Sequence, residues 1–146
     1  MEIDIAVPRA RLAELLADPG NTPAWMDDLD RYEPLSGEPG MPGSSFRLVP
    51  KRGEPYTATV VARELPHRVA LKLENEGVYI AINDRFAPLT DERTRLFSVE
   101  DFYFKGALRN VVGFLARGAI RKAHQRHMHA FKQFAESRRA AAAHQK

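Results

Sequence analysis

Two acidic residues stand in extended segments where apolar and polar residues alternate. Asp84 lies in the segment 78–87, and Glu100 lies in the segment 94–104. Side chains two residues apart point to the same face of a strand, so Glu100 faces the core if Leu96 does. Two carboxylates in one cavity would raise the pKa of one of them and could serve as general acid and general base.

An ordinary alternative exists for both carboxylates. A shift of register by one residue turns every side chain of a strand to the opposite face. Asp84 or Glu100 would then be solvated, or paired with one of the arginines Arg47, Arg85 and Arg109. We favour this alternative over the catalytic one, because so small a shift of register is enough to produce it.

His127 is a third candidate for chemistry, at the edge of the apolar stripe of a helix predicted after Gly106. Histidine titrates near neutral pH, so His127 could meet Glu100 and form a proton-transfer pair. More often such a histidine is a hydrogen-bonded residue at the rim of a core. His124, His127 and His129 form no metal-binding face, because Met128 stands four residues after His124 and residue 129 points away. We expect neither a metal nor a cofactor.

Aromatic and small residues are the better candidates for binding. Alanines on the predicted helix could leave space for an apolar ligand, or could instead let the helix pack closely on the sheet with no cavity. The aromatic side chains that could line a cavity are Trp25, Tyr56, Tyr79, Phe86, Phe102, Phe104 and Phe114, and the small ones include Ala119 and Ala123.

The elements that must position these residues follow from periodicity. Residues 2–7 alternate as a half-buried strand, and Pro8 then opens the first of two short helices. Extended segments separated by short turns come next, at 45–51, 56–65, 68–75, 78–87 and 94–104. Connections this short predict an antiparallel sheet of about six to seven strands, because parallel strands need a longer crossover.

A single long helix is predicted from Gly106 to about Ser137. Its apolar stripe includes Val112, Ala119, Ala123, Ala130 and Phe134, and its opposite face carries Arg117, Arg121, Lys132 and Arg139. An antiparallel sheet with one apolar face must be covered, and this helix is the element long enough to cover it. The prediction is an α+β fold with one domain over residues 1–139 and a disordered tail at 140–146.

Composition limits the function classes. The 146 residues include no cysteine, which excludes disulfides and thiol chemistry. No apolar run is long enough to span a membrane, and the amino terminus lacks the basic region of a signal peptide, so we expect a cytoplasmic protein. Charge is divided unevenly: residues 1–104 hold 12 basic and 18 acidic groups, whereas residues 105–146 hold 10 and 1.

Several local phrases match a known family. Ile5-Ala6-Val7-Pro8 precedes a leucine-rich helix, Gly40-Met41-Pro42-Gly43-Ser44-Ser45-Phe46-Arg47 follows Trp25, and Arg93-Thr94-Arg95-Leu96 opens the last strand. This order resembles the helix-grip fold of the START-like superfamily, also called SRPBCC. It is most similar to the polyketide cyclase/dehydrase and lipid-transport branch, although Arg93 replaces the usual glycine. The resemblance implies a cavity between sheet and helix, and no particular reaction.

Three functions remain open from the sequence. The first is binding of a hydrophobic, lipid-like or polyketide-like molecule in that cavity. The second is a cyclase or dehydratase that uses Glu100 and His127 for proton transfer. The third is an interaction module that acts through the basic helix face. We expect a small hydrophobic ligand, no nucleic acid, no membrane span, and possible homodimer formation. The basic stripe lacks interleaved aromatics, so it fits the solvent side of a sheet-covering helix.

Overall fold

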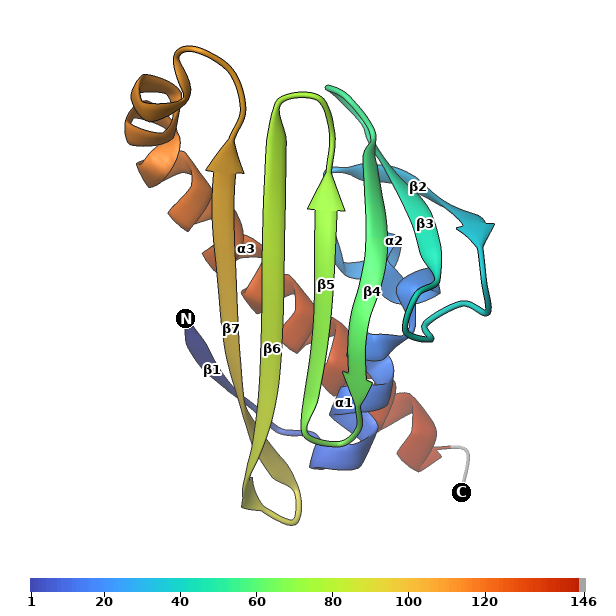
Figure 1. The fold of residues 1–146 in the computed structure, drawn as a ribbon. Helices are drawn as coiled ribbons and strands as arrows, with labels where there is room; N and C mark the ends of the chain where they lie inside the picture. The colour runs from blue at the N-terminus through green and yellow to red at the C-terminus, as the bar shows by residue number, and fades with distance from the viewer. Residues whose placement is uncertain (145–146) are drawn as a thin grey trace.

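The computed structural model describes the backbone of residues 1–144 and the side chains of residues 1–138. A long helix lies across one face of a single antiparallel sheet (Figure 1), which confirms the predicted α+β helix-grip architecture. In chain order the elements are β1 (Glu2–Ile5), α1 (Arg9–Ala17), the 3-10 turn η1 (Pro19–Asn21), α2 (Thr22–Trp25), β2 (Leu29–Ser36), β3 (Ser45–Pro50), β4 (Tyr56–Glu64), β5 (Arg68–Glu74), β6 (Val78–Thr90), β7 (Arg93–Phe104) and α3 (Arg109–His144).

The seven strands lie in the order β1-β7-β6-β5-β4-β3-β2. Strands β2 to β7 form a meander in which each strand pairs with the next, and β1 closes the far edge against β7. Strand β2, Leu29–Ser36, is not among the five extended segments predicted from the sequence. Strand β6 continues to Thr90, past its predicted end at residue 87. The longest pair, β6 and β7, carries both candidate carboxylates.

The segment after β1 contains helix α1, the turn η1 and helix α2. Helix α1 buries Leu12 and Leu15, which recur on one face at helical spacing. Asp18 ends the helix, and its side chain accepts a hydrogen bond of 3.0 Å from the backbone N–H of Gly20. The two short helices expected after the first strand are therefore present, and the second of them places Trp25 against the Phe131 ring, with the ring centroids 5.3 Å apart.

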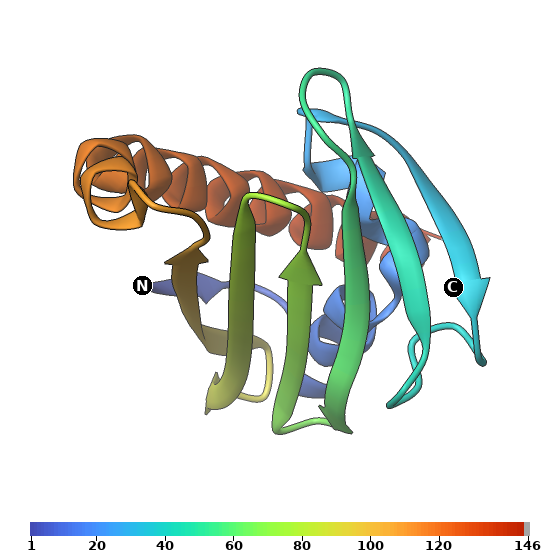
Figure 2. The same ribbon diagram turned by 45° about the horizontal axis from the view of Figure 1, so that its top comes forward.

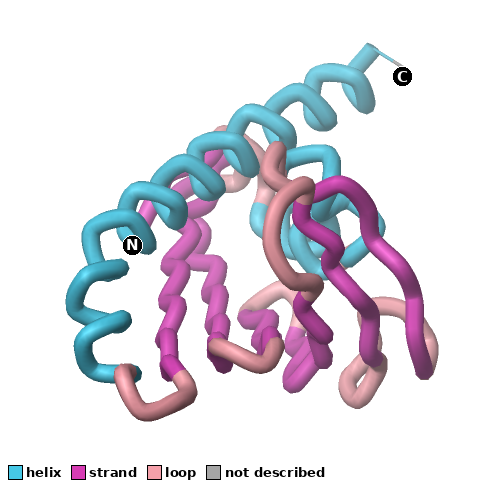
Figure 3. Tube along the Cα trace, turned by 90° about the horizontal axis from the view of Figure 1, so that it is seen from above, coloured by secondary structure: helices cyan, strands magenta, loops and turns pink. Residues whose placement is uncertain are grey.

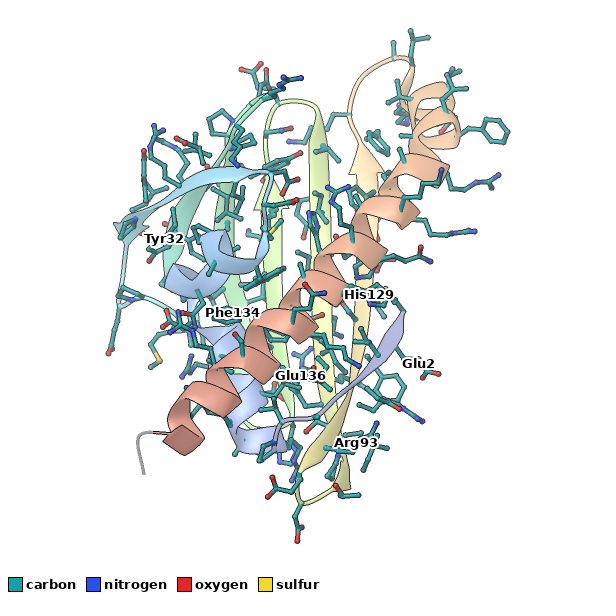
Figure 4. All side chains as sticks on the ribbon, turned by 180° about the vertical axis from the view of Figure 1, so that it is seen from behind. Glu2, Tyr32, Arg93, His129, Phe134 and Glu136 are labelled. Carbon is teal, nitrogen blue, oxygen red and sulfur yellow. The ribbon has the colours of Figure 1, made fainter. Side chains whose placement is uncertain are left out.

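Helix α3 lies on the concave side of the sheet, as the turned view shows (Figure 2), and it arches over the strands when seen from above (Figure 3). In the view from behind, its C-terminal half, which carries Phe134 and Glu136, lies in front of the sheet (Figure 4). The helix continues to His144, beyond the predicted end near Ser137. The tail expected at 140–146 thus begins within the helix, and residues 145 and 146 lie outside the described part.

The core consists of two apolar clusters. One joins α1, β1 and the C-terminal half of α3, with Phe131 at its centre; the other lies under β2 to β6, around Phe46 and Ile80. The predicted helix stripe holds only in part, since Phe134 is buried whereas Val112 is 44% exposed. The space between the two clusters is where a site can form.

Candidate functional site

A cavity of about 380 Å³ lies between the inner face of the sheet and α3. Its volume falls within the range of roughly 300–1,000 Å³ that small-molecule sites occupy. Both apolar clusters contribute to its walls, and the α1–α2 segment closes one side. Most of the lining is apolar, including Leu16, Trp25, Met26, Phe46, Leu48, Tyr56, Val60, Leu71, Leu73, Ile80, Ile82, Phe102, Ile120 and Met128.

Three of the α3 side chains that face the cavity are small, which leaves space beneath the helix. Ala116, Ala119 and Ala123 recur three or four residues apart, so they lie on one face of α3 and all line the cavity. On the next turns, Met128 and Phe131 are buried and the helix packs against its own core cluster. Along α3 the cavity does not extend past Met128.

One corner of the cavity is acidic. In the β6–β7 ladder Asp84 pairs with Ser98 and Ile82 pairs with Glu100, so the two carboxylates are diagonal neighbours on the inner face. Both line the cavity. Of the two arrangements that the sequence left open, the structure has the inward one, because Leu96 is fully buried and fixes the face of β7.

Asp84 is the more deeply buried of the two. Its residue is 5% exposed, and its Oδ1 has no hydrogen-bond partner among the described residues. Burial raises the pKa of Asp84 to about 6, although a hydrogen bond from the Ser98 side chain opposes this rise. An acceptor without a donor in the wall of an apolar cavity is a point where a ligand can form a hydrogen bond.

Glu100 lies beside a histidine. His124 Nε2 is 3.1 Å from Glu100 Oε1 and 3.0 Å from Ser98 Oγ. Burial raises the pKa of Glu100 to about 7, with a smaller contribution from the negative charge of Asp84, and burial lowers the pKa of His124 to about 4. At neutral pH the histidine is therefore uncharged, and its contact with Glu100 is a hydrogen bond rather than an ion pair.

The expected pairing of His127 with Glu100 is wrong. His127 Nε2 lies 3.2 Å from Asp28 Oδ1, at the start of the segment that follows α2. His127 comes three residues after His124, which places it about 4.5 Å further along the helix axis and about 60° away around it. The side chain of His127 therefore lies past β7. His124 takes the place beside Glu100. Its position four residues before the buried Met128 was the signal in the sequence that could have identified it.

Five of the proposed binding residues line the cavity and four do not. Trp25, Tyr56, Phe102, Ala119 and Ala123 belong to its walls. Tyr79 points to the outer face of β6, where its ring lies 5.7 Å from that of Tyr103, and Phe86 is buried in the core cluster around α1. Successive side chains of a strand point to opposite faces, so Tyr79, next to the inward Ile80, points outward. Phe86 points inward but lies beyond the end of the cavity.

The other two residues lie near the N-terminal end of α3. Phe104 stacks on Phe102, and Gly113 approaches it so closely that a Cβ there would lie 3.2 Å from the Phe104 ring. Phe114 is 67% exposed, with the Arg117 guanidinium 5.1 Å above its ring. The first turns of α3, to which Phe114 belongs, extend past the end of β7 (Figure 1).

The basic face of α3 makes only a few contacts. Arg117 and Arg121 are exposed, Lys132 Nζ donates a hydrogen bond of 2.9 Å to the Asp4 carbonyl, and the side chain of Arg139 lies outside the described residues. Part of this face therefore packs on β1. In the described part of the chain, no helix has the length and apolar character that crossing a bilayer requires.

A small charged cluster lies at the rim of the cavity. Ligand atoms of Asp27, Asp28 and His127 lie within 4.8 Å of one another. The Arg126 guanidinium is 3.7 Å from Asp27 Oδ1 and 3.8 Å from Asp28 Oδ2, so the two carboxylates share one cation. This arrangement is an ion-pair cluster at the surface.

Comparisons with known proteins agree on the fold. The profile of a family described as polyketide cyclase/dehydrase and lipid transport matches residues 1–136. An aromatase/cyclase from a Streptomyces species has a TM-score of 0.75 at 21% identity, over 97% of this chain and 94% of that one. A START superfamily protein from Mycobacterium smegmatis has a TM-score of 0.74 at 16% identity, over 94% and 95% of the two chains.

A further similar structure is a norcoclaurine synthase from Thalictrum flavum, in complex with dopamine and hydroxybenzaldehyde. It has a TM-score of 0.67 at 15% identity and covers 92% of this chain and 83% of that one. No curated protein matched the sequence. Identities this low indicate a shared fold and leave the chemistry of this chain to its own residues.

Proposed function

The chain belongs to the polyketide cyclase/dehydrase and lipid transport family, and from that premise we propose that it binds an apolar small molecule between the sheet and α3. The observation that carries the proposal is the cavity of about 380 Å³, with mostly apolar walls and one acidic corner. Shape would come from the aromatic and aliphatic walls, and orientation from Asp84 and Glu100.

The side chains on α3 support this proposal. A helix that only covered a sheet would bury large residues along its whole inner face, as α3 does at Met128 and Phe131. Instead Ala116, Ala119 and Ala123 face the cavity. Wall atoms that face empty space lose dispersion contacts, and a bound apolar molecule would restore them.

A second candidate function is enzymatic, and the contact between His124 and Glu100 favours it. A carboxyl with a pKa of about 7 can both accept and donate a proton at neutral pH. In a β-hydroxy carbonyl ligand, Glu100 would remove a proton from the α-carbon, which lies between the carbonyl carbon and the carbon that bears the hydroxyl. Glu100 would then donate this proton to the hydroxyl group, which leaves as water. His124 would hold the carboxyl in place as a positioning residue. The aromatase/cyclase among the structural neighbours supports this class of reaction.

Ligand binding can be tested without knowing the ligand. Trp25 is the single tryptophan and lines the cavity, so its fluorescence reports occupancy. We expect native mass spectrometry of the purified protein to detect a bound small molecule. We also expect the neutral dye N-phenylnaphthylamine to accept energy from Trp25 on binding. Ala123→Phe should weaken dye binding at least about tenfold, since it fills the cavity from α3.

The matched control is Gln125→Phe, which adds the same ring to an exposed position of α3 two residues away. It should bind the dye as the wild type does. Equal binding by the wild type and Ala123→Phe, with no co-purified ligand, would contradict a binding cavity. Once a ligand is identified, conversion by the wild type and loss of conversion in Glu100→Gln, with binding retained, would distinguish the enzyme from the binding protein.

A further inference from the structure

The charges around the cavity are of one sign. Three carboxylates line it, those of Asp28, Asp84 and Glu100, and among the described lining residues there is no lysine or arginine. Asp28, at the rim, has the Arg126 guanidinium 3.8 Å from its Oδ2. The inner pair, Asp84 and Glu100, has no such cation on the cavity wall.

The polar groups around the inner pair do not neutralise it. His124 is uncharged at neutral pH, and the Ser98 hydroxyl is shared between His124 and Asp84. A cation whose charge does act on both carboxylates is the amino group of Met1, which donates a hydrogen bond of 2.9 Å to the Ser98 carbonyl and is not part of the cavity lining. Among the described residues Asp84 Oδ1 therefore has no donor, and Asp84 lines the cavity.

We propose that the natural ligand is an apolar molecule that carries a protonated amine and presents it to Asp84 and Glu100. This inference rests on the proposed binding function and specifies its ligand class. An ammonium group supplies up to three N–H donors, enough for Asp84 Oδ1 and for Glu100 together, and it offsets the repulsion between the two carboxylates. A hydroxyl would satisfy one acceptor and leave the repulsion in place.

A carboxylate ligand is disfavoured by the same geometry. A fatty acid would bring a third negative charge to a corner with no lysine or arginine among its described neighbours, so the acid or the protein would have to take up a proton. The cavity thus discriminates between head groups by charge, while its apolar walls accept many carbon skeletons. Charge rather than shape is the property to test.

Three probes with the same carbon chain isolate the head group: decylamine, decanol and decanoate. Their binding is measured by displacement of N-phenylnaphthylamine, through the loss of energy transfer from Trp25, at pH 8. At this pH Asp84 and Glu100, with pKa values of about 6 and about 7, are ionised and the amine is still protonated. We expect decylamine to bind most tightly and decanoate to bind at least about tenfold more weakly, as a charge-assisted hydrogen bond predicts.

The variant that tests the site is Asp84→Asn, with Asp101→Asn as its control. Asp101 lies on β7 at an exposed position of the outer face, so its substitution removes a carboxylate without touching the cavity. Asp84→Asn should weaken decylamine about tenfold, change decanol by less than about twofold, and strengthen decanoate. Asp101→Asn should leave all three affinities unchanged. Glu100→Gln gives an independent measurement with the same expected order.

Two outcomes separate failure of this inference from failure of the proposed function. If decanoate binds as tightly as decylamine, or if Asp84→Asn and Glu100→Gln weaken all three probes equally, the amine assignment is overturned and the binding function stands. If none of the three probes displaces N-phenylnaphthylamine from the wild type, the proposed binding function itself is contradicted.

Discussion

At the scale of single residues, burial moves the three titratable groups of the acidic corner towards neutrality. It raises the pKa of Asp84 to about 6 and that of Glu100 to about 7, and it lowers the pKa of His124 to about 4. Removal from water disfavours the charged form of each group, which is why the acids and the base shift in opposite directions. A cationic ligand would reverse the shift of the two acids, because it favours their ionised forms.

The shift at Asp84 predicts a dependence of stability on pH. Between pH 4 and pH 6 the folded protein holds a proton on Asp84 that the unfolded chain has released, so this group stabilises the fold at low pH and its contribution falls as pH rises. A pKa raised from 3.8 to about 6 corresponds to roughly 3 kcal/mol. We therefore compare the free energy of unfolding of Asp84→Asn with that of wild type. The difference, variant minus wild type, should be about 2 kcal/mol higher at pH 8 than at pH 4.

The measurement is urea unfolding of wild type and Asp84→Asn across this pH range. The difference between the two proteins cancels the opposite dependence from His124, whose lowered pKa makes the fold gain stability as pH rises towards 6.5. Asp101→Asn, on the outer face, should differ from wild type by the same amount at every pH. If the difference between Asp84→Asn and wild type also stays the same at every pH, Asp84 is not a buried group with a raised pKa.

The sequence supports part of this corner and not the rest. Alternation along 78–87 and 94–104 was enough to place Asp84 and Glu100 on the faces of Ile82 and Leu96, because the strand period of two is a local property. The choice between His124 and His127 depends on how α3 is rotated against the sheet. A rotation of about 60° separates the two side chains, and only tertiary packing determines it.

At the scale of elements, α3 consists of two halves with different surroundings. Its C-terminal half buries Met128, Phe131 and Ala135 against α1 and β1, whereas its first turns expose large apolar side chains: Val111, Val112, Phe114 and Leu115. A 3.6-residue period predicts one continuous buried stripe from such a sequence. The period carries no information on where the sheet beneath the helix ends, so the exposed half could not be predicted.

Two phenylalanines on α3 give a matched test of this division. Phe131 is 0% exposed and its ring packs against Trp25, so Phe131→Ala should lower the free energy of unfolding by about 3–5 kcal/mol. Phe114 is 67% exposed, and Phe114→Ala should change it by less than about 0.5 kcal/mol. Denaturant unfolding at one pH measures both. A large loss at Phe114 would show that the first turns of α3 are packed.

At the scale of the whole molecule, the cavity divides the core and leaves α3 anchored mainly at one end. The basic helix and the acidic remainder suggest strong attraction, yet the described ion pairs between them, such as those of Arg126 with Asp27 and Asp28, are long and exposed. Pairs of this kind contribute roughly 0–1 kcal/mol. The apolar cluster around Phe131 therefore holds the helix, and the uneven charge has little part in its stability.

Anchoring at one end predicts a gradient of local stability along α3. Amide protons of residues 109–118 should exchange faster than those of residues 128–137, because opening the first turns exposes few buried contacts, whereas opening the last ones breaks the cluster around Phe131. Hydrogen–deuterium exchange with mass spectrometry resolves the two segments. A molecule bound in the cavity touches Ala116, Ala119 and Ala123, so N-phenylnaphthylamine should slow exchange most in the middle of the helix. Uniform protection along α3 in the free protein would show instead that the helix opens as one unit.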